Sequence, residues 1–568
     1  MLEKNLSPTF GKGSKGNDVI FGDAKDNVLQ GGGGDDLIVG SAGNDILSGG
    51  SGFDTLDYSR LNADITFSEG KRIIKSGSMG VDTIKSNNRA IDFEVIRGNA
   101  KRVNTIDYSG SINAAIIADL SSNLLAITGL PAIGSAKLTV INFSNVNGSE
   151  NNDVIIGDDK DNVLQGGGGD DLIVGSTGND VLSGGSGFDT LDYSRLNADI
   201  TFSKGGMIRK SPGMGVDSIA DFDIEVIRAN ANRINTIDAS GGTSAAIIAD
   251  LSSNLLAITG LPAIGSAKLT VINFSNVNGS ENNDVILGDA KANTLNGAGG
   301  NDTISGGGGD DLLLGSSGTD VYRGGAGADT LSYEALAGGV TLVRGGTLIK
   351  ADGSVDTIAD FSVETIVGTK GAVNTIDGST GVTAALNVNL SKQNLTITGL
   401  PFVGTASLTV KNFTDVEGSE NADVITGDKG ANRLSGNGGN DVLTGLGGKD
   451  ILTGGTGADT FVFGYGDSLL SGFDLITDLE IGVDSIDGWA ATAVTTIGRA
   501  SSLNGSDLGR LFGNTFLANG AAAFVVGATG GDRTFLALND SQLGFQAGKD
   551  LIVEITGYTG SLSNLAIV

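Results

Sequence analysis

Hydrophobic and polar positions along much of the chain repeat in short runs with a period of nine residues. In residues 31–57 (GGGGDDLIVGSAGNDILSGGSGFDTLD), each Gly-rich hexamer ends in Asp and is followed by a mostly apolar triplet such as Leu37-Ile38-Val39. The hexamer suits a tight turn, because Gly adopts positive φ angles without steric cost. The triplet suits a short strand whose middle side chain points inward. The pattern therefore predicts short parallel strands joined by tight turns.

The nine-residue units form four blocks, and β-rich segments of a different composition separate them. Self-similarity of this period and composition is typical of a parallel β-roll with calcium in its turns. We therefore expect an all-β fold, a right-handed parallel β-roll or β-helix solenoid with a C-terminal β-rich cap. The expected parts are an N-terminal tail (1–13), blocks at 14–57, 149–192, 280–332 and 419–463, segments at 58–148, 193–279 and 333–418, and a C-terminal cap and secretion-signal domain at 464–568.

The sixth position of each unit carries the candidate metal ligands. Asn occupies it in the second unit of every block, at Asn27, Asn162, Asn293 and Asn432. Because Asn lacks the charge, we expect these turns to bind calcium weakly or to be closed by hydrogen bonds alone. The predicted calcium ligands are the Asp residues of the other units: Asp18, Asp36, Asp45, Asp54, Asp153, Asp171, Asp180, Asp189, Asp284, Asp302, Asp311, Asp320, Asp329, Asp423, Asp441, Asp450 and Asp459.

The charge balance agrees with a metal-loaded chain. The formal net charge is −30, which opposes folding into a compact body unless cations neutralise it. An acidic chain also repels nucleic acid and anionic membranes, so we expect neither as a partner. The chain has no Cys and no His, which excludes disulfides, thiolate chemistry and imidazole catalysis. No apolar run is long enough to span a membrane, and the first residues lack the apolar core of a signal peptide.

The segments between the blocks also repeat. The stretch 114–155 recurs unchanged at 245–286, and a diverged copy runs from 384 to 425. Their β-branched runs predict strands, either as wider, calcium-poor coils of the same solenoid or as antiparallel β insertions. The cations Lys71, Arg72, Arg209 and Lys210 lie in these segments, and we expect them on solvated faces away from the calcium turns.

The C-terminal region departs from the nine-residue period after about residue 464. One helix is expected near residues 504–516, with Ser506 or Asp507 as its N-cap. Strands are expected in AAFVVGA, RTFLALND and LIVEITGY. A solenoid needs such a cap, because an open sheet edge would pair with another chain.

The nine-residue units closely resemble those of the RTX (repeats-in-toxin, hemolysin-type) proteins. That resemblance implies calcium held by backbone carbonyls and the sixth-position Asp, and export by a type I ABC exporter. The stretch FDLITDLEIGVDSID resembles the segment that follows the repeats in serralysin-type proteases. Roughly the last 50 residues are similar to the "bluetail" domain of putative surface proteins of marine picocyanobacteria. This second likeness implies an uncleaved C-terminal secretion signal and a cell-surface or extracellular location.

Taken together, these features favour a secreted calcium-binding protein with a structural or adhesive role, and not an enzyme. A cell-surface glycan or self-association is the expected partner chemistry. The alternative is an extracellular enzyme that acts on polysaccharide, or an accessory module of one. Such enzymes normally have Tyr, His or Arg clusters in a dedicated catalytic domain, and the sequence shows none.

Overall fold

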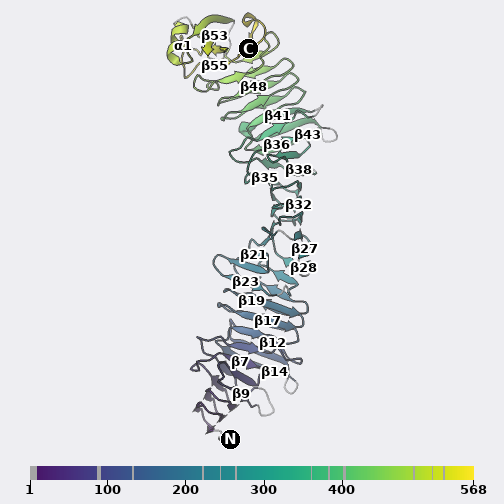
Figure 1. The fold of residues 1–568 in the computed structure, drawn as a ribbon, viewed down its shortest axis with the longest axis vertical. Coiled ribbons are helices and arrows are strands. Elements are labelled where there is room, and N and C mark those ends of the chain that lie inside the picture. Colours follow the sequence, from purple (N-terminus) through teal and green to yellow (C-terminus); the bar gives the residue numbers. More distant parts are fainter. Residues whose placement is uncertain are drawn as a thin grey trace. The chain divides into compact units, whose positions relative to one another are not determined.

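The computed structural model describes residues 9–85, 91–130, 134–220, 223–242, 245–261, 265–343, 345–359, 361–380, 384–400, 404–489, 493–513, 516–528 and 531–568. These form two compact units, residues 1–280 and 281–568. Within each unit, short strands stack one above another (Figure 1). In the described part of the chain, no helix is long and apolar enough to cross a membrane.

In the repeat blocks, successive strands alternate between two parallel sheets. In block 2, β16 pairs with β18 and β18 with β20, while β17 pairs with β19, all in parallel register. One coil therefore contains two nine-residue units. The strands of block 2 are β16 (Val154–Ile156), β17 (Val163–Gly168), β18 (Leu172–Val174), β19 (Val181–Ser186) and β20 (Thr190–Asp192). Block 1 has β1 (Thr9–Lys12), β2 (Val19–Phe21), β3 (Asn27–Gly33), β4 (Leu37–Val39), β5 (Ile46–Ser51) and β6 (Thr55–Asp57).

The core between the two sheets is one side chain thick. The middle residue of each short strand points inward, as the pattern predicts, and is fully buried at Ile155, Ile173, Leu182 and Leu191. Tight turns allow the sheets to approach closely. At Gly185, φ is +104°, and an added Cβ would lie 2.0 Å from the oxygen of Gly167 in the coil below. At Gly185, a side chain would therefore clash with the coil below.

The segments between blocks combine the two predicted arrangements. In segment 2, β19 pairs in parallel with β23 and β20 with β24, so the coils continue. Antiparallel strands are inserted within these coils, since β21, β22 and β23 form one meander and β26, β27 and β28 another. The strands are β21 (Asp199–Ser203), β22 (Met207–Ser211), β23 (Val216–Ile219), β24 (Val226–Arg228), β25 (Thr236–Asp238), β26 (Ala246–Asp250), β27 (Leu255–Leu261), β28 (Gly265–Ile272) and β29 (Asn276–Asn278).

Segment 1 has the same arrangement as segment 2. Its strands are β7 (Ile65–Ser68), β8 (Arg72–Lys75), β9 (Val81–Ile84), β10 (Val95–Arg97), β11 (Thr105–Asp107), β12 (Ala115–Asp119), β13 (Leu124–Leu130), β14 (Gly134–Ile141) and β15 (Asn145–Asn147).

The second unit repeats this design with blocks 3 and 4 around segment 3. Block 3 has β30 (Val285–Leu287), β31 (Thr294–Asn296), β32 (Thr303–Gly308), β33 (Leu312–Leu314), β34 (Val321–Ala326) and β35 (Thr330–Ser332). Segment 3 has β36 (Val340–Val343), β37 (Thr347–Lys350), β38 (Val355–Ile358), β39 (Thr365–Val367), β40 (Thr375–Asp377), β41 (Ala385–Asn389), η1 (Leu390–Lys392), β42 (Asn394–Leu400), β43 (Gly404–Lys411) and β44 (Asp415–Glu417). Block 4 has β45 (Val424–Thr426), β46 (Arg433–Ser435), β47 (Val442–Thr444), β48 (Ile451–Thr453) and β49 (Thr460–Val462).

The C-terminal region covers the last coil of the second unit. Strand β55 pairs with β50, and β56 pairs with β51, so both edges of the coil are occupied. The expected helix is present as α1 (Gly505–Phe512), but its N-cap is Asn504, whose side chain accepts the N–H of Asp507. The strands are β50 (Asp474–Ile476), β51 (Ser485–Asp487), β52 (Val494–Ala500), β53 (Ala521–Ala528), β54 (Gly531–Leu538), β55 (Leu551–Glu554) and β56 (Ala566–Ile567), with η3 at Leu562–Asn564.

Candidate metal centres in the repeat turns

A ladder of hydrogen bonds orients the sixth-position Asp residues. The backbone N–H of Asp153 donates to Oδ1 of Asp171 at 2.7 Å, and the N–H of Asp171 donates to Oδ1 of Asp189 at 2.8 Å. Each step spans 18 residues, which is one coil. The same bond joins Asp284 to Asp302 in block 3. One oxygen of each carboxylate is therefore fixed by the neighbouring turn, and the other is held inside the stack.

The second carboxylate oxygen, Oδ2, is buried without a hydrogen-bond partner in ten of the seventeen predicted ligands. A buried, unpaired carboxylate is strongly unfavourable unless a cation or donor compensates it. These oxygens thus need a positive partner that the described side chains do not supply. The ten residues are Asp36, Asp54, Asp171, Asp189, Asp302, Asp311, Asp329, Asp441, Asp450 and Asp459.

Electrostatics of the turns favour cation binding. Burial raises the pKa of Asp171 to about 7, and the charges of neighbouring Asp residues add to the effect. Burial likewise raises the pKa of Asp302 and of Asp441 to about 7. An Asp whose charge is disfavoured in this way gains most from a nearby divalent cation.

Backbone oxygens complete the donor set. A Cβ added at Gly166 would lie 2.2 Å from Oδ2 of Asp171 and 2.4 Å from the carbonyl oxygen of Gly184. The missing side chain of Gly166 therefore leaves room where a carboxylate and a carbonyl of the next turn converge. Within the described ranges, no three acidic side chains gather closely enough to hold an ion alone. Carbonyl and carboxylate oxygens together are the ligands that calcium prefers, so the residues fit this ion.

The Asn-bearing turns contain closing hydrogen bonds, which is one of the two arrangements expected for them. Oδ1 of Asn27 accepts the N–H of Asp23 at 2.9 Å, and Nδ2 of Asn27 donates to Oδ1 of Asp23 at 2.9 Å. Asn162 makes the same pair of bonds with Asp158. An amide satisfies both its donor and its acceptor within one turn, which an Asp carboxylate could not do.

The first turns of three blocks are closed by a serine. Asp423 accepts the backbone N–H and the hydroxyl of Ser419 and the N–H of Leu386. Asp153 has the same partners in Ser149 and Ile116, and Asp18 is bound by Ser14. Unlike the ten residues above, Asp153 and Asp423 accept hydrogen bonds at both carboxylate oxygens, and Asp18 accepts them at Oδ2. The role of all seventeen Asp residues as calcium ligands stays a prediction.

One turn in each of blocks 1 to 3 contains a buried lysine. In block 3, Lys350 Nζ donates to the carbonyl of Ser316 at 2.7 Å and to Oδ1 of Asp356 at 2.6 Å, and it lies 3.5 Å from Oδ2 of Asp320. The hydroxyl of Tyr333 donates to the other oxygen of Asp356. An ammonium group thus lies among the carbonyl and carboxylate oxygens of this turn. Lys75 with Asp45 and Lys210 with Asp180 repeat the arrangement.

The sequence-based placement of Lys210 on a solvated face is therefore wrong. Its side chain has no exposed surface. Lys71, Arg72 and Arg209 are exposed, as expected. The cause is the alternation along β22, which turns Arg209 outward and Lys210 inward to the turn of block 2.

Sequence reasoning also missed carboxylates that continue the ladder outside the blocks. Oδ1 of Asp217 accepts the N–H of Asp180 across 37 residues, and Glu225 accepts the N–H of Asp189. Asp474 accepts the N–H of Asp450, has a free buried Oδ2 and a pKa raised by burial to about 8. Insertions hide the coil period around Asp217. The sequence signal that could have found it is the VDTI or VDSI motif, which recurs at residues 81–84, 216–219 and 355–358.

Fold and site together define a parallel β-roll whose Gly-rich turns carry buried Asp carboxylates, ten of them with an unpaired Oδ2. The family model of the RTX calcium-binding nonapeptide repeat matches the blocks, at residues 12–24, 21–56, 147–182, 156–191, 278–313, 297–331, 417–452, 426–461 and 435–470. The four blocks are therefore RTX repeats, which bind several calcium ions.

Two other comparisons add little. A crystal structure of the extracellular lipase LipA from Serratia marcescens matches with 13% identity and a TM-score of 0.17, covering 70% of this chain and 67% of the lipase chain. A TM-score this low supports no conclusion about the fold or the function. No curated protein matches.

The raised pKa values predict how the calcium-free chain responds to pH. Burial raises the folded-state pKa of Asp171 and Asp302 from the ordinary value of 3.8 to about 7, so the folded state binds more protons between those two values. Stability without calcium should therefore fall as pH rises from about 4 to 7. In far-UV circular dichroism of the chain freed of calcium by dialysis, we therefore expect more residual β-structure at pH 5.5 than at pH 8. More β-structure at pH 8 than at pH 5.5 would contradict this prediction.

Proposed function

We propose that the chain is a secreted protein with a structural or adhesive role at the cell surface or outside the cell. The observation that carries the proposal is the set of ten buried Asp residues with an unpaired Oδ2. Where calcium is scarce, as in a cytoplasm, these carboxylates oppose folding. Where calcium is plentiful, as outside a cell, the ions bind the folded turns and stabilise them.

Export is proposed to use a type I ABC exporter and a signal within residues 464–568. Such an exporter transports an unfolded chain, and calcium-dependent folding would keep the chain unfolded until it leaves. The same region closes the last coil through β55 and β56, so it also serves as a cap. The proposed partners are a cell-surface glycan or a second copy of the chain, contacted by the segments between the blocks.

Immunolabelling of intact cells of the native host tests this function. We expect labelling at the surface or in the medium, and loss of cell attachment when the gene is deleted. A chain without residues 464–568 should remain inside the cell, whereas a chain without segment 1 (58–148) should still be exported. Full-length protein confined to the cytoplasm would overturn the proposal.

The role is proposed to be non-catalytic. The matching measurement is a panel of extracellular polysaccharides incubated with the calcium-loaded chain. We expect binding without depolymerisation or epimerisation. Turnover of any polysaccharide that disappears after mutation of Asp or Glu residues in a segment would favour the enzymatic alternative.

A further inference from the structure

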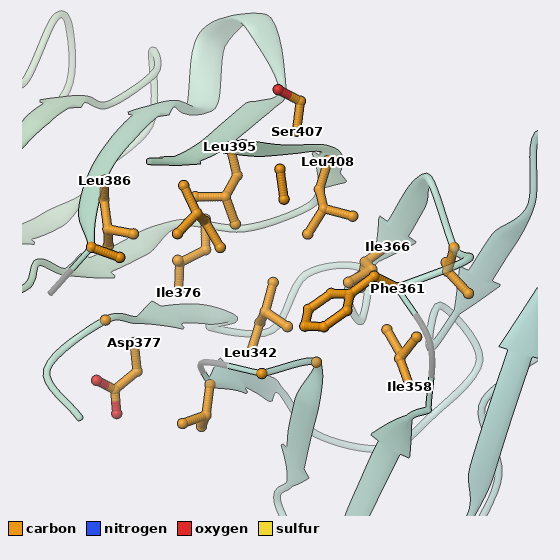
Figure 2. Close-up of a pocket in the computed structure, with 18 of the residues that line it drawn as sticks. Leu342, Ile358, Phe361, Ile366, Ile376, Asp377, Leu386, Leu395, Ser407 and Leu408 are labelled. Atoms are coloured by element: carbon orange, nitrogen blue, oxygen red, sulfur yellow. The ribbon is translucent and has the colours of Figure 1, made fainter. Parts of the chain in front are cut away.

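A cavity lies inside segment 3, between the coil and the antiparallel strands inserted in it. Its volume is about 100 Å³. Figure 2 shows the side chains of Leu342, Ile376, Leu386 and Leu395 converging on it from β36, β40, β41 and β42. Asp377 also lines it, but its Oδ1 accepts hydrogen bonds from the N–H and the hydroxyl of Ser379, and Figure 2 shows its carboxylate turned away. Glu364 also lines the cavity, and its carboxylate accepts the N–H of Asp329, so the interior is mostly apolar.

Segment 2, in the other unit, has the same cavity at the same place. Its volume is about 90 Å³. Strand register makes the linings equivalent, since Ile237 faces Phe202 in segment 2 as Ile376 faces Leu342 in segment 3. The remaining apolar lining of segment 2 comes from Ala245, Ile247, Leu256 and Ile258. Because the cavity recurs in both units, we treat it as a regular feature of the fold of these segments.

One position next to the cavity differs in all three segments. It follows the NTID motif (residues 104–107, 235–238 and 374–377) and holds Tyr108 in segment 1, Ala239 in segment 2 and Gly378 in segment 3. The backbone is equivalent in all three, because each N–H donates to a carbonyl of the next coil at 2.8 or 2.9 Å. Only the side chain differs.

In segment 1, the ring of Tyr108 occupies the place of the cavity. It packs edge-on against Phe67, with 6.4 Å between ring centroids, and Phe67 is the counterpart of Phe202. A Cβ added at Gly70, the counterpart of cavity-lining Gly205, would lie 3.1 Å from the Tyr108 hydroxyl oxygen. Tyr108 is 1% exposed. Segment 1 thus contains its own aromatic ring where segments 2 and 3 have space.

We propose that the cavities of segments 2 and 3 each bind one phenol-sized aromatic ring. An engineered apolar cavity of about 150 Å³ in another protein binds benzene, so a mostly apolar cavity of this order can take up an apolar ring. Edge-to-face contact with a lining ring such as Phe202 favours an aromatic over an aliphatic guest. The inference goes beyond the proposed structural or adhesive function and does not depend on it.

The polar end of the ligand is indicated by segment 2. The buried hydroxyl of Tyr108 has no hydrogen-bond partner in segment 1, where Glu69 lies on the neighbouring strand end. At the position of Glu69, segment 2 has Lys204, which lines its cavity and whose Nζ donates to the carbonyl oxygen of Gly241 at 3.4 Å. The ammonium group has two further N–H groups, so it can also donate to a phenol oxygen. Because Tyr108 fills the equivalent place in segment 1 with a phenol ring, the ligand class is a phenol, either a free molecule or the side chain of a tyrosine.

Methyl NMR of the full-length, calcium-loaded chain tests this site, with p-cresol, the tyrosine side chain itself, as the probe. Ring currents should shift the Ile δ1 methyls of segments 2 and 3 but not those of segment 1, which serves as the internal control. The reporters are Ile237, Ile247 and Ile258 in segment 2, Ile376 and Ile397 in segment 3, and Ile106, Ile116 and Ile127 in segment 1. A parallel titration with N-acetyl-tyrosinamide distinguishes the two sources of the ring. If both probes shift the methyls, the tyrosine side chain of a peptide can be the ligand. If only p-cresol shifts them, the ligand is a free phenol.

Two variants make the assignment specific. Ala239→Tyr supplies the ring that segment 1 already has, so the segment 2 methyls should lose their response while those of segment 3 keep it. Tyr108→Ala should open a third cavity and make the segment 1 methyls respond. Should Tyr108→Ala fail to fold, Ala239→Tyr still decides the question. The proposal is overturned if segment 2 responds equally in wild type and Ala239→Tyr, or if neither segment responds to p-cresol.

Discussion

Chelation of calcium with EGTA is expected to remove most of the parallel β-structure of the RTX blocks. Ten buried Asp residues have an unpaired Oδ2, and burial raises the pKa of Asp171, Asp302 and Asp441 to about 7. One site filled at 100 times its Kd adds about 2.7 kcal/mol to stability, so three such sites add about 8 kcal/mol. That amount is comparable to the whole stability of a typical domain, about 5–15 kcal/mol.

Far-UV circular dichroism during a calcium titration measures this effect. β-Structure that persists fully in EGTA would contradict the prediction.

A matched pair of variants in block 2 assigns the effect to the buried oxygens. Asp171→Asn keeps Oδ1 for the N–H of Asp153 but removes the charge, so the transition should need more calcium. The exposed Asp161 also accepts a backbone N–H, from Asn179, and Asp161→Asn should leave the transition unchanged.

Replacing Lys350 with Met is expected to lower the free energy of unfolding by about 3–5 kcal/mol. Lys350 Nζ is within 2.6 Å of Asp356 and 3.5 Å of Asp320, and both Asp side chains have no exposed surface. Burial raises the pKa of Asp356, while the hydrogen bond from Lys350 lowers it. Loss of the ammonium would leave two buried carboxylates with no compensating cation, and this is the origin of the expected loss.

Urea unfolding in constant calcium measures that loss. Lys370→Met, at an exposed position, is the control and should change stability by less than about 0.5 kcal/mol. Adding Asp356→Asn to Lys350→Met removes one of the two uncompensated buried charges and should recover part of the lost free energy of unfolding. Equal effects of Lys350→Met and Lys370→Met would show that the lysine is not needed in the turn.

The nine-residue period predicts the local structure well because turn and strand are decided within each unit. Gly residues allow the tight turn, and the single inward side chain of each strand forms the core, as at Ile155 and Leu182. The strands expected at the C-terminus and the helix α1 are present for the same local reason. The N-cap is Asn504 and not Ser506 or Asp507, because the cap depends on which residue leaves the helical conformation first.

The sequence by itself determined the β-roll and its calcium-binding repeats, since each depends on residues a few positions apart. Only the tertiary structure decided what meets a turn from a distant coil. Lys350 reaches the turn of Asp320, and Asp217 accepts the N–H of Asp180, because inserted strands lengthen the coil from 18 to 37 residues. A lysine on a strand is expected to face solvent, and only the register of the strand shows that its side chain points inward. For the same reason, no local pattern shows that Tyr108 fills a space that Ala239 and Gly378 leave open.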